Sequence, residues 1–494
     1  MGVRTRFQSE HGDLGLATTV YAETVSTAQP MSHPDAAWLH MDRPTNLMVI
    51  TGVLWFDQTP DWERVREIIR ERFVEPYPRF RQRVVEGGQP LAGASWEDDP
   101  RFDLDLHVHR VALPPPGDRE ELRALVADLT ATPLDRTKPL WEFYLVDGFG
   151  EGAAMVSRIH HCIADGIALA RVLLSLTDDL PDSGFRPPET SEGEPRHGPI
   201  GAITDSAKGV FSAAVGAAGT VAHESLEVAK HPTHMLDLAS VTREDADALA
   251  KVLLKEPEPK TSFKGEMGVV KAVNWSDPIS LEDVRTMGHD TGTTVNDVVL
   301  TGVAGAFRRY LMTRDSLVDE VNTVIPFNLR PPSEPLPPTL GNRFGLVSIP
   351  LPVGIGDRRR RLREIHDRME KIKHSPEGVV SYGVLDALGR MPEQVERRVI
   401  DTTSAASTAV ITNVPGPPET VYLAGTPVAG VLVWAPASGD ISMTVSIFSY
   451  SGEITVGLLV DEGLIPDPGE IVGTFESEIK ALLRLKRPAG KASS

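Results

Sequence analysis

The sequence has only one cysteine, Cys162, among 494 residues, so no intramolecular disulfide can form. This usage is typical of a protein of the reducing cytoplasm. The chain also lacks an apolar run of about eighteen residues, and we therefore expect no membrane-spanning helix. It does not open with a charged-then-apolar signal pattern, and residues 1–28 are predicted to be a poorly ordered extension. Basic residues are outnumbered, and the net charge of −19 argues against general nucleic-acid binding.

The composition is otherwise that of a soluble globular protein, with 41% hydrophobic and 24% charged residues. The chain is too long for one hydrophobic core, which predicts two domains. Strands alternate with helices in both halves, which indicates an α/β class. In the first half we expect strands over 47–56, 78–85, 102–111, 140–146 and 153–159, and helices over 32–39 (capped by Ser32 or Asp35), 61–73, 122–129 and 167–180. In the second half we expect strands over 269–275, 321–326, 346–351, 408–414, 430–436, 441–450 and 453–459, and helices over 281–287, 296–312, 357–374 and 471–485.

Two segments have both a functional and a structural interpretation. Gly201–Ala229, which follows a Pro/Gly/Ser/Glu-rich stretch, is either an interfacial membrane helix or a linker helix packed on protein. Its shortage of Lys and Arg favours the linker. The arginine run Arg358–Arg361 either meets phosphates or anionic lipid, or forms a solvated helix face beside Asp357 and Glu364, and the solvated face is the default.

The segment HHCIADG, His160–Gly166, carries the chemistry of the chain. It lies between a predicted strand and a predicted helix, where a rigid frame can present side chains to a cleft. Imidazole is the side chain best suited to move protons near neutral pH. Successive side chains of an extended segment point to opposite faces, so one histidine should face the cleft and the other the interior.

Other interpretations of this segment stay open on the motif alone. The histidine pair could be a metal site, although HHxxxD lacks the helical HExxH spacing and no Cys cluster is near. It could equally be a pair of core histidines at a turn. Cys162 is a candidate nucleophile, although a small buried filler is the commoner role of such a residue.

Six blocks in chain order resemble the bacterial wax ester synthase/acyl-CoA:diacylglycerol acyltransferase family, within the HHxxxDG group of CoA-dependent acyltransferases. The blocks are MSHPDAAWL at 31–39, PLDRTKPLWEFYLVDG at 133–148, HHCIADG at 160–166, TVNDVVL at 294–300, GNRFG at 341–345 and TNVPGP at 412–417. One HHxxxDG is moderately specific, whereas six ordered blocks that span most of the chain are strong support.

The resemblance implies an α/β fold of two chloramphenicol-acetyltransferase-like domains, each a mixed sheet with helices, with an active-site tunnel between them. The corresponding boundaries are an N-terminal extension at 1–28, an N-terminal acyltransferase-like domain with HHxxxDG at 29–190, a linker with a helix at 191–262, a C-terminal acyltransferase-like domain at 263–487 and a tail at 488–494. The implied activity is transfer of a long-chain fatty acyl group from acyl-CoA to the hydroxyl of diacylglycerol, of a fatty alcohol, or of both.

The resemblance also implies roles for individual residues. His161 would be the general base and His160 a supporting residue. Asp165 would be a structural brace, held by an arginine, and not a member of a triad. Gly166 is expected to let the backbone turn tightly into the helix. Asn296 would position the alcohol or the oxyanion, and its alternative role is a helix cap.

The residue types fit the chemistry of thioester alcoholysis. A histidine can take the proton of the alcohol and return it to the leaving thiolate, while a donor stabilises the growing charge on the carbonyl oxygen. The chain has no GxSxG nucleophile elbow, so no covalent acyl-enzyme is expected.

Several residues of the blocks are candidates for the substrate pocket. Trp141 and Asn342 are the main candidates, followed by Phe344, Asn413 and Gly416. A tryptophan on a strand is otherwise a core residue, and Asn413 otherwise stabilises a turn before the next proline.

Two other functions compete with this interpretation. One is a condensation-type acyltransferase that uses a carrier-bound thioester, and the other is a non-catalytic lipid-binding or lipid-body protein. The lack of a carrier domain and the PLW and ND blocks favour the acyl-CoA enzyme, and intact His161, Asp165 and Asn296 argue against lost catalysis. No metal or cofactor is expected beyond acyl-CoA as a substrate. Because the acceptors dissolve in lipid, we expect a cytoplasmic protein in peripheral contact with the inner face of the membrane or with lipid bodies.

Overall fold

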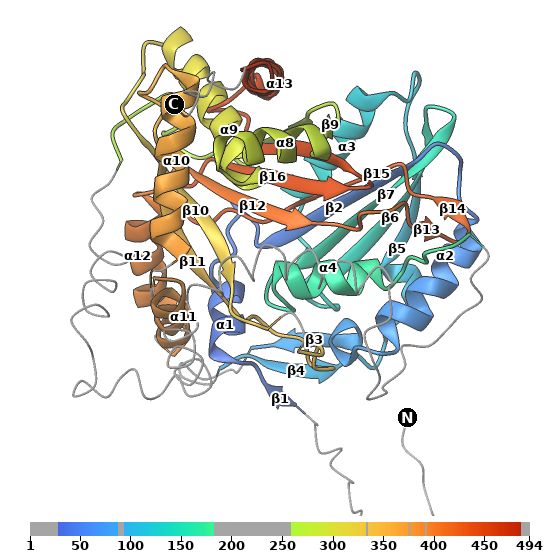
Figure 1. Cartoon of the computed structure of the whole chain (residues 1–494). Helices are drawn as coiled ribbons and strands as arrows, with labels where there is room; N and C mark the ends of the chain where they lie inside the picture. Colours follow the sequence, from blue (N-terminus) through green and yellow to red (C-terminus); the bar gives the residue numbers. More distant parts are fainter. Residues whose placement is uncertain are drawn as a thin grey trace, which may run out of the picture.

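The computed structural model describes residues 28–86, 93–181, 258–331, 334–373, 375, 377–390 and 393–485. Within these residues, two large sheets pack against each other and helices cover them (Figure 1). The predicted extension up to residue 27, the linker helix within 201–229 and the tail 488–494 lie outside the described residues.

The N-terminal sheet has the strand order β15-β2-β7-β6-β5. Its strands are β2 (Val49–Phe56), β5 (Val108–Ala112), β6 (Trp141–Phe149), β7 (Gly152–His160) and β15 (Gly430–Trp434). Only β5 and β6 run parallel, and the other pairs are antiparallel. All residues of β7 are buried because it is a central strand with apolar side chains on both faces.

The C-terminal sheet has the order β11-β10-β12-β16-β17-β8, with the short β9 added beside β17. Its strands are β8 (Lys271–Trp275), β9 (Ile279–Ser280), β10 (Val321–Asn328), β11 (Phe344–Leu351), β12 (Ala409–Pro415), β16 (Met443–Tyr450) and β17 (Glu453–Asp461). Strands β10, β12 and β16 are parallel, so this sheet is mixed as well.

Strand β15 joins the two halves of the chain, because it comes from the second half but pairs with β2 of the first. The surfaces of the two sheets meet around three tryptophans. Trp55 of β2 stacks on Trp275 of β8 with 6.2 Å between ring centroids, and Trp275 contacts Trp434 of β15 at 6.1 Å. One hydrophobic core therefore extends from the N-terminal sheet into the second half.

Helices complete the layers. They are α1 (His33–His40), α2 (Trp62–Ile69), α3 (Arg119–Ala131), α4 (Gly166–Leu174), α8 (Leu281–Thr291), α9 (Val295–Thr313), α10 (Arg358–Lys373), α11 (Glu377–Leu388), α12 (Glu393–Ser404) and α13 (Pro468–Leu483). A second core lies between the C-terminal sheet and α8, α9, α10 and α13, which Figure 1 shows above β16 and beside β10.

Two predicted strands begin later in the structure than expected. The strand predicted from Pro78 begins only at Gln82, because Pro78 opens a 3-10 turn that buries Phe80. The strand predicted over 102–111 begins at Val108, since a 3-10 turn capped by the Asp103 side chain precedes it. A small sheet, β1-β4-β3 (Gln29–Pro30, Ser95–Asp98, Gln82–Val85), lies beside these turns.

The helix after the motif is shorter than predicted, because it ends at Leu174 and not at Leu180. The hydroxyls of Ser175 and Thr177 bond back to carbonyls of the last turn. The chain then leaves the helix, and Asp178 pairs with Tyr422. Tyr422 belongs to a two-stranded hairpin, β13 (Tyr422–Leu423) and β14 (Thr426–Pro427).

Candidate active site

The HHxxxDG turn connects β7 to α4 and is fixed by backbone bonds. The His161 N–H donates to the carbonyl of Met48 before β2 at 2.7 Å. Asp165 caps α4, because its side chain accepts from the Ala168 N–H at 2.8 Å. Its other oxygen accepts from the Arg343 N–H at 3.1 Å and lies 3.9 Å from Arg330 Nη2. Asp165 therefore ties the motif to the connection between β10 and β11, in the arrangement expected of a brace held by an arginine.

Gly166 does not have the role expected of it. Its φ is not in the left-handed region, and a Cβ built there would meet no atom within 4 Å. The turn therefore does not require glycine at this position, and space remains open in front of the first turn of α4.

His161 is buried, and its ring is sandwiched among apolar and amide groups. It stacks on Trp38 with 4.3 Å between ring centroids and lies 5.2 Å from Phe344. Its Nδ1 lies 2.9 Å from the side-chain oxygen of Asn342. Burial lowers the pKa of His161 to about 4, and the bonds to its own carbonyl and to Asn342 oppose this only in part. The imidazole is therefore neutral at pH 7.

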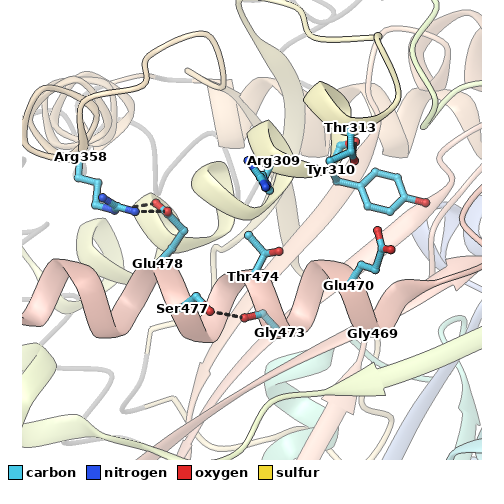
Figure 2. A pocket seen from close by; sticks show the side chains of 10 residues that line it. All are labelled: Arg309, Tyr310, Thr313, Arg358, Gly469, Glu470, Gly473, Thr474, Ser477 and Glu478. Carbon is cyan, nitrogen blue, oxygen red and sulfur yellow. Dashed lines mark hydrogen bonds and ion pairs between the residues drawn. The ribbon is translucent and has the colours of Figure 1, made fainter.

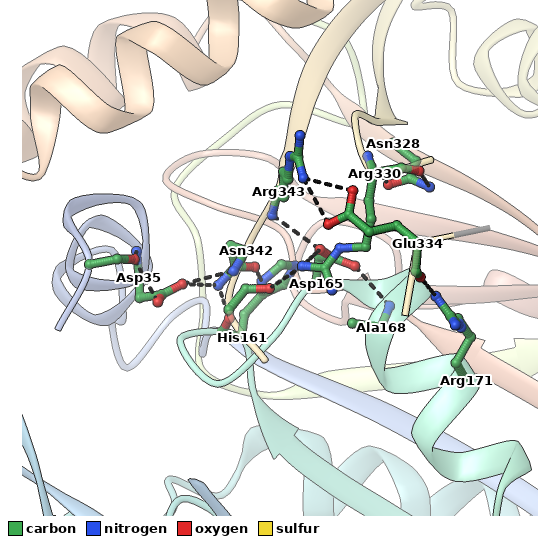
Figure 3. A network of polar contacts seen from close by, with 12 residues as sticks. Asp35, His161, Asp165, Ala168, Arg171, Asn328, Arg330, Glu334, Asn342 and Arg343 are labelled. Carbon is green, nitrogen blue, oxygen red and sulfur yellow. Dashed lines mark hydrogen bonds and ion pairs between the residues drawn. The ribbon is translucent and has the colours of Figure 1, made fainter. Parts of the chain in front are cut away.

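The bonds of Asn342 decide which nitrogen of His161 carries the proton (Figure 3). The Asn342 amide nitrogen donates to Asp35 Oδ1 at 2.8 Å and to the His161 carbonyl at 2.7 Å. Both partners can only accept, so the amide oxygen must face His161 Nδ1. Nδ1 then donates, and Nε2 holds the free lone pair that a general base needs.

Asp35 supports this arrangement and was not predicted as a site residue. It accepts from the Asn342 N–H at 3.0 Å and from the Ser32 hydroxyl at 2.6 Å. Burial raises its pKa to about 6, against the lowering effect of these bonds. Ser32, and not Asp35, is the cap of α1. The available signal was the block MSHPDAAWL, in which an acidic residue lies three positions before a tryptophan.

His160 faces away from this group, as the alternation of side chains predicts. Its Nδ1 accepts from the Cys162 N–H at 3.1 Å, so its proton lies on Nε2, 3.8 Å from Asp42 Oδ2. Cys162 is fully buried, and burial raises the pKa of its thiol well above the ordinary value. Cys162 is thus unsuited to be a nucleophile.

Trp141 lies in the core and not beside the motif histidines. It is fully buried, its indole N–H donates to the Phe80 carbonyl at 2.9 Å, and its ring stacks on His107 at 4.5 Å. Trp141 therefore occupies the core position that was its alternative role in the sequence analysis, and its indole N–H is already used by the Phe80 carbonyl. Phe344 does lie beside His161, as described above.

Asn296 lies in the first turn of α9 but does not cap it. The cap is a box of Thr294 and Asp297. The Asn296 side chain instead accepts from Asn413 at 3.0 Å, which joins the ND and NVPGP blocks. Among the described residues, it makes no hydrogen bond to either motif histidine. Gly416 approaches β16 closely, since a Cβ would lie 2.5 Å from the Ser449 carbonyl oxygen.

An apolar cavity of about 120 Å³ begins at Trp38. Its walls come from α1, α11, α12, β10 and β11 and include Leu346, Leu385, Leu388 and Ile400. The indole nitrogen of Trp38 is buried and finds no acceptor in the described part of the chain. The cavity thus has an apolar wall, and at its end lies Trp38, whose ring stacks on His161 and carries the buried N–H donor.

Further buried donors, for which the described residues offer no hydrogen-bond partner, lie where the two sheets meet. They are the hydroxyls of Thr51, Thr412, Thr444 and Ser442 and the indole nitrogen of Trp434. Ser446 of β16 lies opposite Thr412 of β12, and its hydroxyl donates to the carbonyl of Val433 in β15. The face of the C-terminal sheet that carries Ser446 and Thr412 is therefore turned toward the N-terminal sheet. The seam between the sheets is therefore lined by groups able to bind substrate oxygens.

A larger groove of about 600 Å³ lies between α9 and α13, on the other side of the C-terminal sheet (Figure 2). Arg358 there pairs with Glu478 at 2.6 Å. Arg361 is buried and pairs with the same carboxylate. The arginine run was predicted to be a solvated helix face, and Arg361 is an exception to that prediction. The residues that line the groove make no hydrogen bond to the HHxxxDG segment within the described part of the chain.

Comparison with known proteins defines the class of this fold. A solved wax ester synthase/diacylglycerol acyltransferase from Marinobacter aquaeolei VT8 superimposes with a TM-score of 0.64 at 22% identity and covers 92% of this chain and 98% of its own. The first condensation domain of the calcium-dependent antibiotic synthetase gives a TM-score of 0.57 at 14% identity, with 93% and 96% covered. The fold is thus the two-domain α/β architecture that these two proteins share.

Sequence models identify the family. The model of the wax ester synthase/diacylglycerol acyltransferase catalytic domain matches residues 31–299, and that of the WS/DGAT C-terminal domain matches 340–483. The chain belongs to the wax ester synthase/diacylglycerol acyltransferase family and is an acyltransferase. It is 26% identical over 454 residues to the "Probable diacyglycerol O-acyltransferase tgs1" of Mycobacterium tuberculosis, with 90% of this chain and 93% of that protein covered. Another relative from that organism is 28% identical over 474 residues, with 92% and 96% covered.

None of the helices in the described residues is long and apolar enough to cross a membrane.

Proposed function

We propose that this acyltransferase moves a long-chain acyl group from acyl-CoA to the hydroxyl of diacylglycerol or of a long-chain fatty alcohol. The single observation that carries the proposal is the neutral, buried His161 with its Nδ1 proton held by Asn342. The relatives' names support diacylglycerol as an acceptor, and the family name supports both acceptors. Acyl-CoA acts as a substrate, and the reaction needs no resident metal or cofactor.

In the proposed mechanism His161 Nε2 removes the proton of the acceptor hydroxyl as its oxygen attacks the thioester carbonyl. The tetrahedral intermediate collapses with cleavage of the carbon–sulfur bond. The CoA thiolate then takes the proton from His161, which regenerates the neutral ring. Asp165 acts only as a brace, and His160 supports the turn through its bond to the Cys162 N–H.

Donors for the oxyanion are available on both sides of the inter-sheet seam. The unpartnered Trp38 indole N–H and the seam hydroxyls, of which Thr444 is one, support such a role because a preorganised donor in a water-poor site is effective. Asn296 remains our candidate for positioning the alcohol, with Asn413 as its partner. The chain of a substrate would enter the apolar cavity beside Trp38.

The lipid acceptors dissolve in membranes, so we propose that the enzyme works in peripheral contact with a membrane surface or lipid body. Vesicle flotation of the purified protein tests this contact. Recovery of all the protein in the soluble fraction at low salt would contradict it.

The experiment that tests the function is product analysis with purified enzyme. Palmitoyl-CoA is offered with diolein or with hexadecanol, and esters are separated and quantified beside thiol release. Ester formation with either acceptor supports the proposal and names the main one. If the enzyme reacts only with palmitoyl-phosphopantetheine on a carrier protein, a condensation-type acyltransferase replaces the proposed function. The fold is also similar to that of a condensation domain.

A further inference from the structure

Three arginines converge where α4 meets the connection between β10 and β11 (Figure 3). Arg171 Nη1 donates to the Glu334 backbone carbonyl at 2.9 Å, and Arg343 Nη1 lies 3.0 Å from both oxygens of the Glu334 carboxylate. Arg330 lies 3.9 Å from Asp165. Within this cluster Glu334 pairs with Arg343 and Asp165 faces Arg330, whereas Arg171 has no carboxylate within 4 Å among the described residues.

The hydrogen bonds of the cluster are incomplete as well. Arg330 is 5% exposed, yet its Nε and Nη1 find no acceptor among the described residues, and the same holds for the buried Nε of Arg171. Burial and then the charge of Arg330 lower the pKa of Arg171, against the raising effect of Asp165 and Glu334. Buried N–H groups of a cation without acceptors are strongly unfavourable, and they indicate a place for an anion.

The arginines of the cluster come from two elements, since Arg171 belongs to α4 and Arg330 and Arg343 to the connection between β10 and β11. Guanidinium forks from different directions match the geometry of a phosphate group better than that of a single carboxylate, because phosphate accepts from several directions.

We propose that Arg171, Arg330 and Arg343 form a binding site for a phosphate group of the acyl-CoA donor. This inference rests on the proposed function, in which acyl-CoA supplies the acyl group. The position fits, because Arg343 follows Asn342, which holds His161, and its N–H bonds Asp165 of the motif. In CoA the pantetheine arm separates the phosphates from the thioester, so their site must lie near His161 but not against it.

The test compares two thioesters. Palmitoyl-CoA carries the phosphates, whereas palmitoyl-N-acetylcysteamine lacks them together with the adenosine and most of the pantetheine arm, so the effect of each arginine is read from the change in the ratio and not from the ratio itself. For Arg171→Gln and for Arg343→Gln, the ratio of kcat/KM with palmitoyl-CoA to kcat/KM with palmitoyl-N-acetylcysteamine should fall roughly tenfold, the effect of one lost charge-assisted hydrogen bond. Arg309→Gln, at an exposed arginine of α9, is the matched control and should keep the ratio of the wild type.

A variant of Glu334 separates phosphate binding from simple bracing of the loop. If the arginines bind phosphate, Glu334→Gln removes a competing carboxylate and raises the ratio. If they only clamp the loop, Glu334→Gln releases the clamp and weakens turnover of both thioesters alike. An unchanged ratio in both arginine variants, or equal losses with both thioesters, would overturn the proposal.

A binding measurement distinguishes this result from failure of the proposed function. If the wild type releases no thiol from either thioester, the acyl-CoA function fails, and titration calorimetry with CoA then decides the site alone. The Kd for CoA should rise roughly tenfold in Arg171→Gln. Loss of binding to phosphatidylglycerol vesicles in Arg171→Gln with unchanged CoA binding would assign the arginines to lipid head groups. Loss of inorganic phosphate binding in the variant with unchanged CoA binding would assign them to free phosphate. Either result contradicts the proposal.

Discussion

Replacing Asn342 with leucine should disable the base at His161 without removing the histidine. Leucine has a similar size but cannot accept the Nδ1 proton, so the proton is free to move to Nε2, where it blocks the lone pair. In the serine protease template, loss of the group that fixes the tautomer costs about 10⁴ in kcat. Because Asn342 is neutral and its bond weaker than that of a carboxylate, we expect kcat to fall about 10²-fold.

The same substitution also has a stability effect that can be worked out. It removes one donor from Asp35 and the donor to the His161 carbonyl. Each buried group left without a partner costs about 1–3 kcal/mol of the free energy of unfolding. Asn46→Leu is the matched control, since the Asn46 amide is also buried and donates to the Gly439 and Ile441 carbonyls.

The assay is thiol release from palmitoyl-CoA with kcat and KM measured separately, beside denaturant unfolding of both variants. Asn342→Leu should lower kcat and leave KM within about twofold, because an interaction needed only in the transition state is lost. Asn46→Leu should lose stability by a similar amount but lose much less kcat. Equal losses of kcat in both variants would refute the role of Asn342 in fixing the tautomer.

Three further predictions concern pH and packing. The acid limb of kcat/KM should lie near pH 4, because His161 is active when neutral and burial lowers its pKa to about 4; a limb near the ordinary 6.5 would show that the base is not buried His161. Asp35→Asn should raise the free energy of unfolding at pH 8 by up to about 3 kcal/mol, because the folded pKa of about 6 exceeds the ordinary 3.8 and the charged form is disfavoured in the folded state. The gain should shrink as the pH falls from 6 to 4. A gain that does not depend on pH in denaturant titrations would contradict this origin. Trp141→Leu should lower the free energy of unfolding by about 3 kcal/mol with little change in KM, because Trp141 is a core residue. A large change in KM would show that Trp141 contacts the substrate.

Local patterns predicted the elements around the motif well. The apolar run before His160 and the helical spacing after Gly166 form β7 and α4, because burial and periodicity act over a few residues. Helices α11 and α12 fall where no element was predicted. In α11, Gly378 and Gly383 interrupt the pattern and weaken the helical signal.

The partners of the motif could not be predicted from local patterns. Asp35 and Asn342 are 307 residues apart, and only the packing of the β10–β11 connection against α1 brings them together. The transfer of β15 into the N-terminal sheet depends on long-range pairing of the same kind. The family blocks identified His161 and Asn342 as important but not that one holds the other. Trp141 shows the opposite case, because a residue in a recognisable block proved to be core.

The most direct test of the central claim is thiol release from palmitoyl-CoA by His161→Ala in the presence of the better acceptor. Loss of a general base should lower the rate roughly 10²–10⁴-fold. His289→Ala, at an exposed histidine of α8, should react like the wild type. A folded His161→Ala enzyme within a few-fold of the wild-type rate would show that another group removes the proton and would contradict the account.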